Sequence, residues 1–122
     1  MTPLPVPPAH VASVRIVHYP DRVLTRAALT PEQLDHLAVT HVVVSKRSAI
    51  ESVVRALDGM APVPEQVTPD SRWGVTLLDA HGATIARVYL DKFGKRALID
   101  GRGARVDGEP VVQLLAKLAP PA

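Results

Sequence analysis

Residues 72–106 have the sequence RWGVTLLDAHGATIARVYLDKFGKRALIDGRGARV, in which apolar stretches are separated by turn-forming residues. We predict four strands here, over residues 73–78, 84–90, 95–99 and, more weakly, 104–106. The dipeptide Asp100-Gly101 is a strong hairpin signal, because both residues tolerate a positive φ. Alternation in the second strand places Ala86, Val88 and Leu90 on one face. The second half of the chain is therefore predicted to be an antiparallel meander.

A helix is expected after this meander, from about Pro110. Val111, Leu114, Leu115 and Leu118 give it one apolar stripe, and the pair of prolines at 120–121 stops it.

The first half of the chain mixes strands with helices. We expect strands over residues 11–19, 23–25 and 41–44, the last of them buried. A short helix should begin at Thr30, because Thr30 and Gln33 can form a capping box, and it should bury Leu34 and Leu37.

A second helix is expected after Ser48, which with Glu51 matches another capping box. Its apolar positions follow the helical repeat, and Gly59 ends it. These positions are Ile50, Val53, Val54 and Leu57.

These elements predict an α+β fold, in which an antiparallel sheet is covered on one face by two or three helices. The sheet would consist of the N-terminal strand plus the C-terminal meander. We expect a Pro-rich flexible arm over residues 1–10 and a single α+β domain over 11–119. A Pro-rich connector over 61–70 would join the two halves of that domain.

Composition excludes several classes of protein. The 122 residues include no cysteine, so no disulfide, thiolate metal site or thiol nucleophile is possible. The five histidines show no metal-ligand spacing, and no serine lies in a hydrolase motif. We therefore predict no catalytic residue, no metal site and no cofactor. A chain this short also leaves little room for a ligand-sized cleft beside its core.

Charge is distributed unevenly, because residues 91–105 hold five basic residues against Asp91 and Asp100. The whole formal excess of +2 therefore lies in this segment, which we call the basic hairpin. It predicts contact with an acidic protein surface, or else a solvated hairpin whose charges protect a sheet edge. The predicted binding residues are Lys92, Lys95, Arg96, Arg102 and Arg105. Nucleic acid is a poor match, since only one Trp, two Tyr and one Phe are present.

The beginning of the chain carries four prolines in eight residues and lacks the basic and apolar regions of a signal peptide. It fits a mature exported domain or a native cytoplasmic start, and we expect export to the periplasm. No apolar run is long enough to span a bilayer.

A recurring pattern combines Arg72-Trp73 and Asp79 with Tyr89-x-Asp91-x-Phe93-Gly94. On these residues, the stretch 41–108 resembles small uncharacterised exported or lipoprotein-type domains of bacteria. The resemblance implies a bacterial envelope protein and transfers no catalytic residue.

We accordingly expect a non-enzymatic protein-binding module of the bacterial cell envelope, of which an inhibitor or immunity-type protein is one kind. Two alternatives stay open: a small hydrolase-type enzyme with an unrecognised site, and an anion-binding module using the basic hairpin. The sequence leaves the oligomeric state open.

Overall fold

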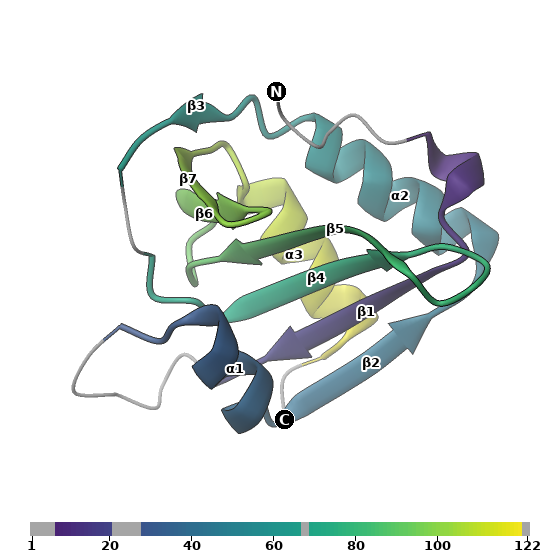
Figure 1. The fold of residues 1–122 in the computed structure, drawn as a ribbon, viewed down its shortest axis with the longest axis horizontal. Coiled ribbons are helices and arrows are strands. Elements are labelled where there is room, and N and C mark those ends of the chain that lie inside the picture. The colour runs from purple at the N-terminus through teal and green to yellow at the C-terminus, as the bar shows by residue number, and fades with distance from the viewer. Residues whose placement is uncertain (1–6, 21–27, 67–68, 121–122) are drawn as a thin grey trace.

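Apolar residues alternate along β4 (Trp73–Leu78) and β5 (Thr84–Leu90), and these strands lie near the middle of a seven-stranded antiparallel sheet (Figure 1). The computed structural model describes residues 7–20, 28–66 and 69–120. The strand order is β2-β1-β4-β5-β6-β7-β3. The other strands are β1 (Ser13–His18), β2 (Thr40–Val44), β3 (Val63–Pro64), β6 (Arg96–Ile99) and β7 (Arg102–Arg105).

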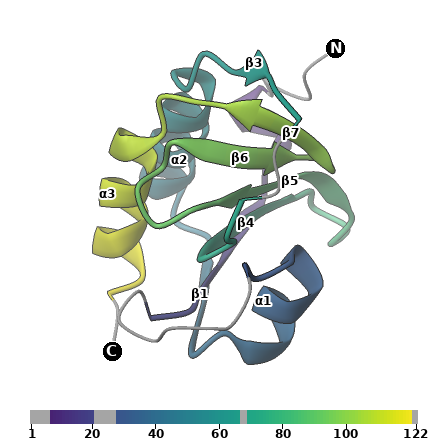
Figure 2. The same ribbon diagram turned by 90° about the vertical axis from the view of Figure 1, so that its left-hand side faces the viewer.

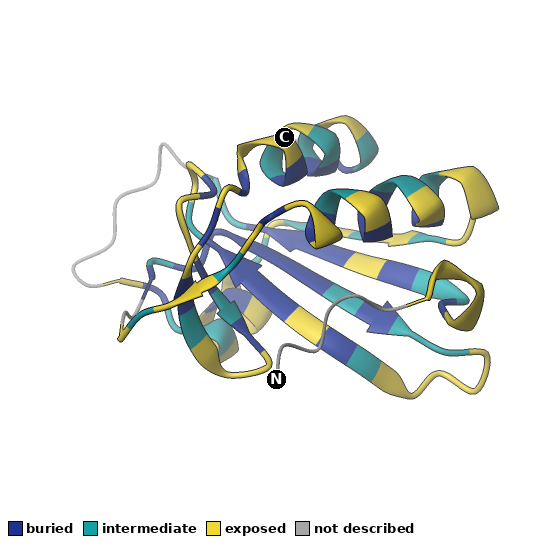
Figure 3. Cartoon of the chain, turned by 90° about the horizontal axis from the view of Figure 1, so that it is seen from above, coloured by how far each residue is buried: buried dark blue, intermediate teal, exposed yellow. Residues whose placement is uncertain are grey.

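Helices lie on both faces of this sheet. α2 (Arg47–Asp58) and α3 (Glu109–Leu118) cover one face, and the short α1 (Pro31–Leu37) lies on the other (Figure 2). Seen from above, α2 and α3 carry buried residues toward the sheet and exposed residues away from it (Figure 3). The predicted α+β class, with an N-terminal strand added to a meander and two helices on one face, is confirmed.

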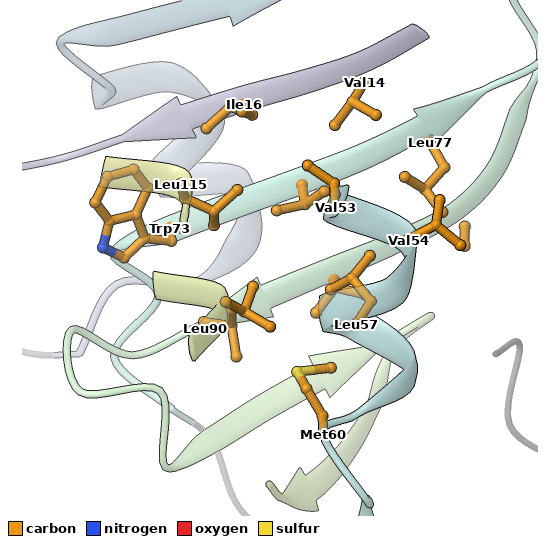
Figure 4. Close-up of a cluster of buried hydrophobic side chains, with 14 of the residues drawn as sticks. Val14, Ile16, Val53, Val54, Leu57, Met60, Trp73, Leu77, Leu90 and Leu115 are labelled. Atoms are coloured by element: carbon orange, nitrogen blue, oxygen red, sulfur yellow. The ribbon is translucent and has the colours of Figure 1, made fainter. Parts of the chain in front are cut away.

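The main core fills the space between the sheet and these two helices (Figure 4). The predicted stripe of α2 is fully buried, whereas in α3 Val111 and Leu115 are buried and Leu114 and Leu118 are half-buried. The sheet contributes the inward residues of its central strands, which are Val14, Ile16, Trp73, Val75, Leu77, Ala86, Val88 and Leu90.

The turns of the meander follow the predicted chemistry. Asp100 and Gly101 have φ values of 48° and 84°, as a two-residue hairpin turn requires. Gly94 has a φ of 70° and packs closely on Gly108. A Cβ added at Gly94 would stand 2.5 Å from the carbonyl group of Gly108. This contact, with the Gly108 amide donating to the Gly94 carbonyl at 2.8 Å, fixes where the chain enters α3.

Two expectations about burial are wrong. Leu37 is 50% exposed, because α1 ends there after seven residues and only Leu34 reaches the sheet. β2 is also not a buried strand: it forms one edge of the sheet, and Val43 is 65% exposed.

The predicted cap at Ser48 is wrong as well. α2 begins at Arg47, whose guanidinium donates to the carbonyl oxygens of Pro8 and Val11 at 2.7 and 2.8 Å. Ser48 therefore lies inside the first turn. In α1, by contrast, the Thr30–Gln33 capping box is present in both directions.

The Pro-rich segments have some structure of their own. Pro8–His10 form one turn of 3-10 helix, and residues 1–6 lie outside the described residues. The predicted strand over 23–25 lies outside them too. Within the connector, Val63 and Pro64 form β3, which pairs with β7.

We expect Leu57→Ala and Leu115→Ala each to lower the free energy of unfolding by about 2–5 kcal/mol, because both side chains are fully buried. Leu37→Ala is the matched control, with an expected loss on the order of 0.5 kcal/mol at its half-exposed site. Urea denaturation measures all three. Equal midpoints for the buried and exposed variants would contradict this packing.

Candidate functional site

The structure separates the five predicted residues of the basic hairpin, although all five are exposed. Arg96 and Arg105 stand directly opposite each other on β6 and β7. Lys92 and Lys95 belong to the turn before β6, and Arg102 lies at the far end of the hairpin, opposite Ile99.

Two residues of the hairpin are near carboxylates. Arg96 is 3.8 Å from Glu65 and Lys95 is 4.0 Å from Glu109. By the strand register, Arg96 and Arg105 project from one face of the hairpin, whereas Arg102, paired with the buried Ile99, projects from the other.

A different polar group forms on the sheet face that carries α1, which we call the α1 face. The strand register places Arg15 of β1 opposite Thr76 of β4, and Thr76 opposite Arg87 of β5. Residues paired in register project from the same face, so the two arginines flank the threonine with Cα atoms roughly 10 Å apart. Both arginines are exposed, and Thr76 is half-buried.

A second row lies two residues further along the same strands. It places Val17, Gly74 and Tyr89 side by side, with His41 of β2 at its end. A Cβ at Gly74 would stand 2.7 Å from Val17 Cγ2 and 3.0 Å from Tyr89 Cε1. The missing side chain therefore leaves the space in which the Tyr89 ring lies.

Tyr89 is held in place by α1. Leu34 packs with Val17 and Tyr89 in a small apolar cluster on this face. The Tyr89 hydroxyl donates to the Asp35 carboxylate, with oxygen–oxygen distances of 3.0 and 3.2 Å. Burial, and then this hydrogen bond, raise the pKa of Tyr89 to about 12. At neutral pH Tyr89 is thus a fixed hydroxyl donor.

These residues border two depressions. The smaller, which we call the arginine hollow, has a volume of about 160 Å³ and is lined by Arg15, Thr76, Arg87 and Tyr89 among others. The larger, which we call the wide groove, measures about 590 Å³ and lies toward Asp100. Asp35, Arg87 and Tyr89 border both. The wide groove is of ligand size, where the length of the chain had predicted little room for such a cleft.

The two depressions share some of their charged residues. Arg15, Arg87 and the Asp35 carboxylate line the arginine hollow, and Glu32, Asp35, Arg87 and Asp100 line the wide groove. Asp100 is already engaged, since its carboxylate accepts the Arg87 amide at 2.8 Å. Two arginines against the one Asp35 carboxylate give the lining of the arginine hollow a positive excess.

The turn aspartates are explained by local structure, as expected. The Asp91 carboxylate accepts the Lys95 amide at 2.8 Å. The amides of His81 and Ala83 donate to Asp79 and lower its pKa. In the described ranges, no group of three or more His, Asp or Glu is placed to hold a metal ion.

Sequence reasoning missed Arg15, Arg87 and Tyr89. For the last two a signal existed, because the burial of Ala86, Val88 and Leu90 implies that Arg87 and Tyr89 project from the opposite face. Nothing local indicated that Arg15 would join them.

Comparison with protein-family models, with curated proteins and with solved structures finds no match to this chain. Among the helices of the described segments, none combines the length and apolar character that crossing a membrane requires.

We expect Gly74→Ala to lower the free energy of unfolding by about 1–3 kcal/mol, because the new methyl group would collide with Val17 and the Tyr89 ring. Gly59→Ala is the control: its φ is −79° and its nearest neighbour would be 3.5 Å away, so little change is expected. The denaturant midpoints of the Gly74→Ala and Gly59→Ala variants measure the two effects. Equal effects would mean that Gly74 is not needed for space.

The raised pKa of Tyr89 predicts a loss of stability at high pH. In the unfolded chain this tyrosine ionises near its model value of 10.0, whereas in the folded protein it ionises at about 12. Its stabilising contribution is therefore complete below pH 10 and declines as the pH rises toward 12.

Tyr89→Phe should remove this part of the pH dependence, as measured by unfolding free energy across that range. Ultraviolet titration of the wild type should show a phenolate transition near pH 12 that the Tyr89→Phe variant lacks. If Tyr89→Phe instead removes a transition near pH 10, the Tyr89–Asp35 contact does not persist in solution.

Proposed function

We propose that this chain is a non-enzymatic protein-binding module that holds an acidic side chain of its partner in the arginine hollow. The observation that carries the proposal is the row of Arg15, Thr76 and Arg87, fixed in register on an exposed sheet face.

The chemistry of this row suits a carboxylate. Two guanidinium groups and a hydroxyl supply hydrogen-bond donors, and guanidinium binds carboxylates through paired N–H groups. Among the described residues, no carboxylate lies within ion-pair distance of Arg15 or Arg87. Both stand on paired strands, so the spacing of their backbone positions is fixed before a partner arrives.

The size of the hollow favours a side chain over a cofactor. Its volume of about 160 Å³ is below the roughly 300–1,000 Å³ of typical small-molecule pockets. An aspartate or glutamate side chain needs no more. The neighbouring wide groove would then take the residues on either side of that acid.

The described residues also support binding over catalysis. The α1 face offers Tyr89 as its buried ionisable hydroxyl, and a pKa of about 12 disfavours the phenolate that a nucleophile would need. An inhibitor or immunity-type protein acts in the proposed way, by contact alone.

Two basic surfaces, the arginine hollow and the basic hairpin, compete as the site for the acidic partner, and charge complementarity would speed its association with either. We favour the arginine hollow over the basic hairpin, because Arg96 and Lys95 already lie near Glu65 and Glu109.

Location in the bacterial periplasm is a further part of the proposal. It rests on the Pro-rich composition of residues 1–8 and on the resemblance to exported domains. Cell fractionation of the native host, with antibody detection, tests it independently of binding.

Charge reversal distinguishes the two basic surfaces. The double variant Arg15→Glu/Arg87→Glu should weaken binding of a labelled glycine–glutamate peptide about tenfold or more and remove most of its salt dependence. The matched variant Lys95→Glu/Arg96→Glu should have a smaller effect. Binding is followed by titration in ¹⁵N NMR, which also locates the peptide.

Exposed charges contribute little to folding, so both variants should unfold at nearly the wild-type midpoint. If the hairpin variant loses as much binding as the sheet variant, or more, the basic hairpin is the site. If neither loses binding, an acidic partner is excluded for both surfaces.

A further inference from the structure

The two edges of the sheet differ. β3, at one edge, has two residues, one of which is Pro64. Short strands and prolines are devices that protect a sheet edge from pairing with another chain. β2, at the other edge, has five residues and no such device. No described element lies beyond it (Figure 1).

The sequence around β2 is uncharged. Residues 37–44 are Leu-Ala-Val-Thr-His-Val-Val-Val, with no proline, glycine, lysine or acid. Three of its side chains are strongly exposed: Leu37 at 50%, Val39 at 57% and Val43 at 65%. A neutral, β-branched edge of this kind favours addition of another strand.

We infer that β2 pairs antiparallel with β2 of a second copy of this chain, joining two sheets into one. A two-fold axis through the strand generates this arrangement, and it keeps α1 of both copies on the same side of the joined sheet.

The second copy is the occupant that the charges favour. The edge has no charged residue with which to select an acidic or basic strand, whereas self-pairing brings no like charges into opposition. In the register centred on Val42, Thr40 stands opposite Val44 of the other copy.

A five-residue strand buries less surface than the roughly 1,200–2,000 Å² of a stable interface. The dimer should therefore be weak and concentration-dependent. Sedimentation velocity on the full chain, from about 1 µM to about 1 mM, should show the mean mass rising from 13.1 kDa toward twice that value.

Matched lysine substitutions identify the edge. Val43→Lys on β2 should weaken self-association about tenfold or more, whereas Val63→Lys on β3 should leave it unchanged. Both valines are exposed edge residues, at 65% and 48%, so both variants should fold, as circular dichroism would verify. A wild-type protein that stays monomeric throughout, or equal losses in the two variants, would overturn the proposal.

Because the chain has no cysteine, single-cysteine variants can report the register. In a two-fold antiparallel pair one residue stands opposite itself, with Cα atoms about 4.5–5.5 Å apart, within disulfide range. Of His41→Cys, Val42→Cys and Val43→Cys, we expect Val42→Cys to form a disulfide dimer on oxidation.

A crosslink confined to any one of the three supports antiparallel pairing and gives its register. No crosslink at any of them, or equal crosslinking of Val63→Cys on the opposite edge, contradicts it. The arginine variants of the proposed binding site leave β2 intact, so self-association and peptide binding are tested separately.

Discussion

The pairing of β1 with β4 is the contact on which the rest of the structure depends, because it joins the two halves of the chain. Residues 13–18 enter the sheet between β2 and the meander, in register with residues 73–78. On one face this pairing completes the layer of Val14, Ile16, Val75 and Leu77 on which α2 and α3 pack. On the other face it sets Arg15 beside Thr76. The same strand register therefore determines both the core and the candidate site. A slip of one residue would exchange those faces and destroy both.

Tyr89 connects this register to α1. Its ring occupies the space that Gly74 leaves, and its hydroxyl donates to Asp35 of α1. Leu34 is the buried residue of that helix, and its Thr30 cap satisfies the first turn. A helix of seven residues is too short to be stable alone, so its position depends on these tertiary contacts. The glycine, the tyrosine and the helix thus form one unit, and this unit shapes both depressions.

The sequence contained most of the fold, because the decisive signals are local. The alternation in residues 84–90, the Asp100-Gly101 turn and the stripe of α2 each predicted their element correctly. Errors occurred where a distant contact competes with a local pattern. Arg47 reaches Pro8 and Val11, and α2 consequently begins before Ser48. The candidate site was missed for the same reason: Arg15 and Arg87 are 72 positions apart, and only the strand order brings them together. The basic hairpin was found because its basic residues are neighbours in the sequence. Nearness in sequence does not determine whether their side chains project from the same face of the sheet.

The length of α1 explains why part of this face of the sheet is left uncovered. Seven residues of helix extend roughly 10 Å, while seven strands spaced about 4.8 Å apart extend roughly 30 Å. α1 packs against β1 and β4, near the end of those strands where Val17 and Gly74 lie. The row of Arg15, Thr76 and Arg87, two residues further along, is left uncovered, as is the pair of Arg96 and Arg105 across the sheet. On the opposite face the longer α2 and α3 leave no such gap over the core. An antiparallel sheet commonly packs one face on the core and leaves the other to solvent, so an open face is compatible with a stable fold. In this sheet the open face carries exposed arginines beside a short helix, and the proposed binding of an acidic side chain rests on that arrangement.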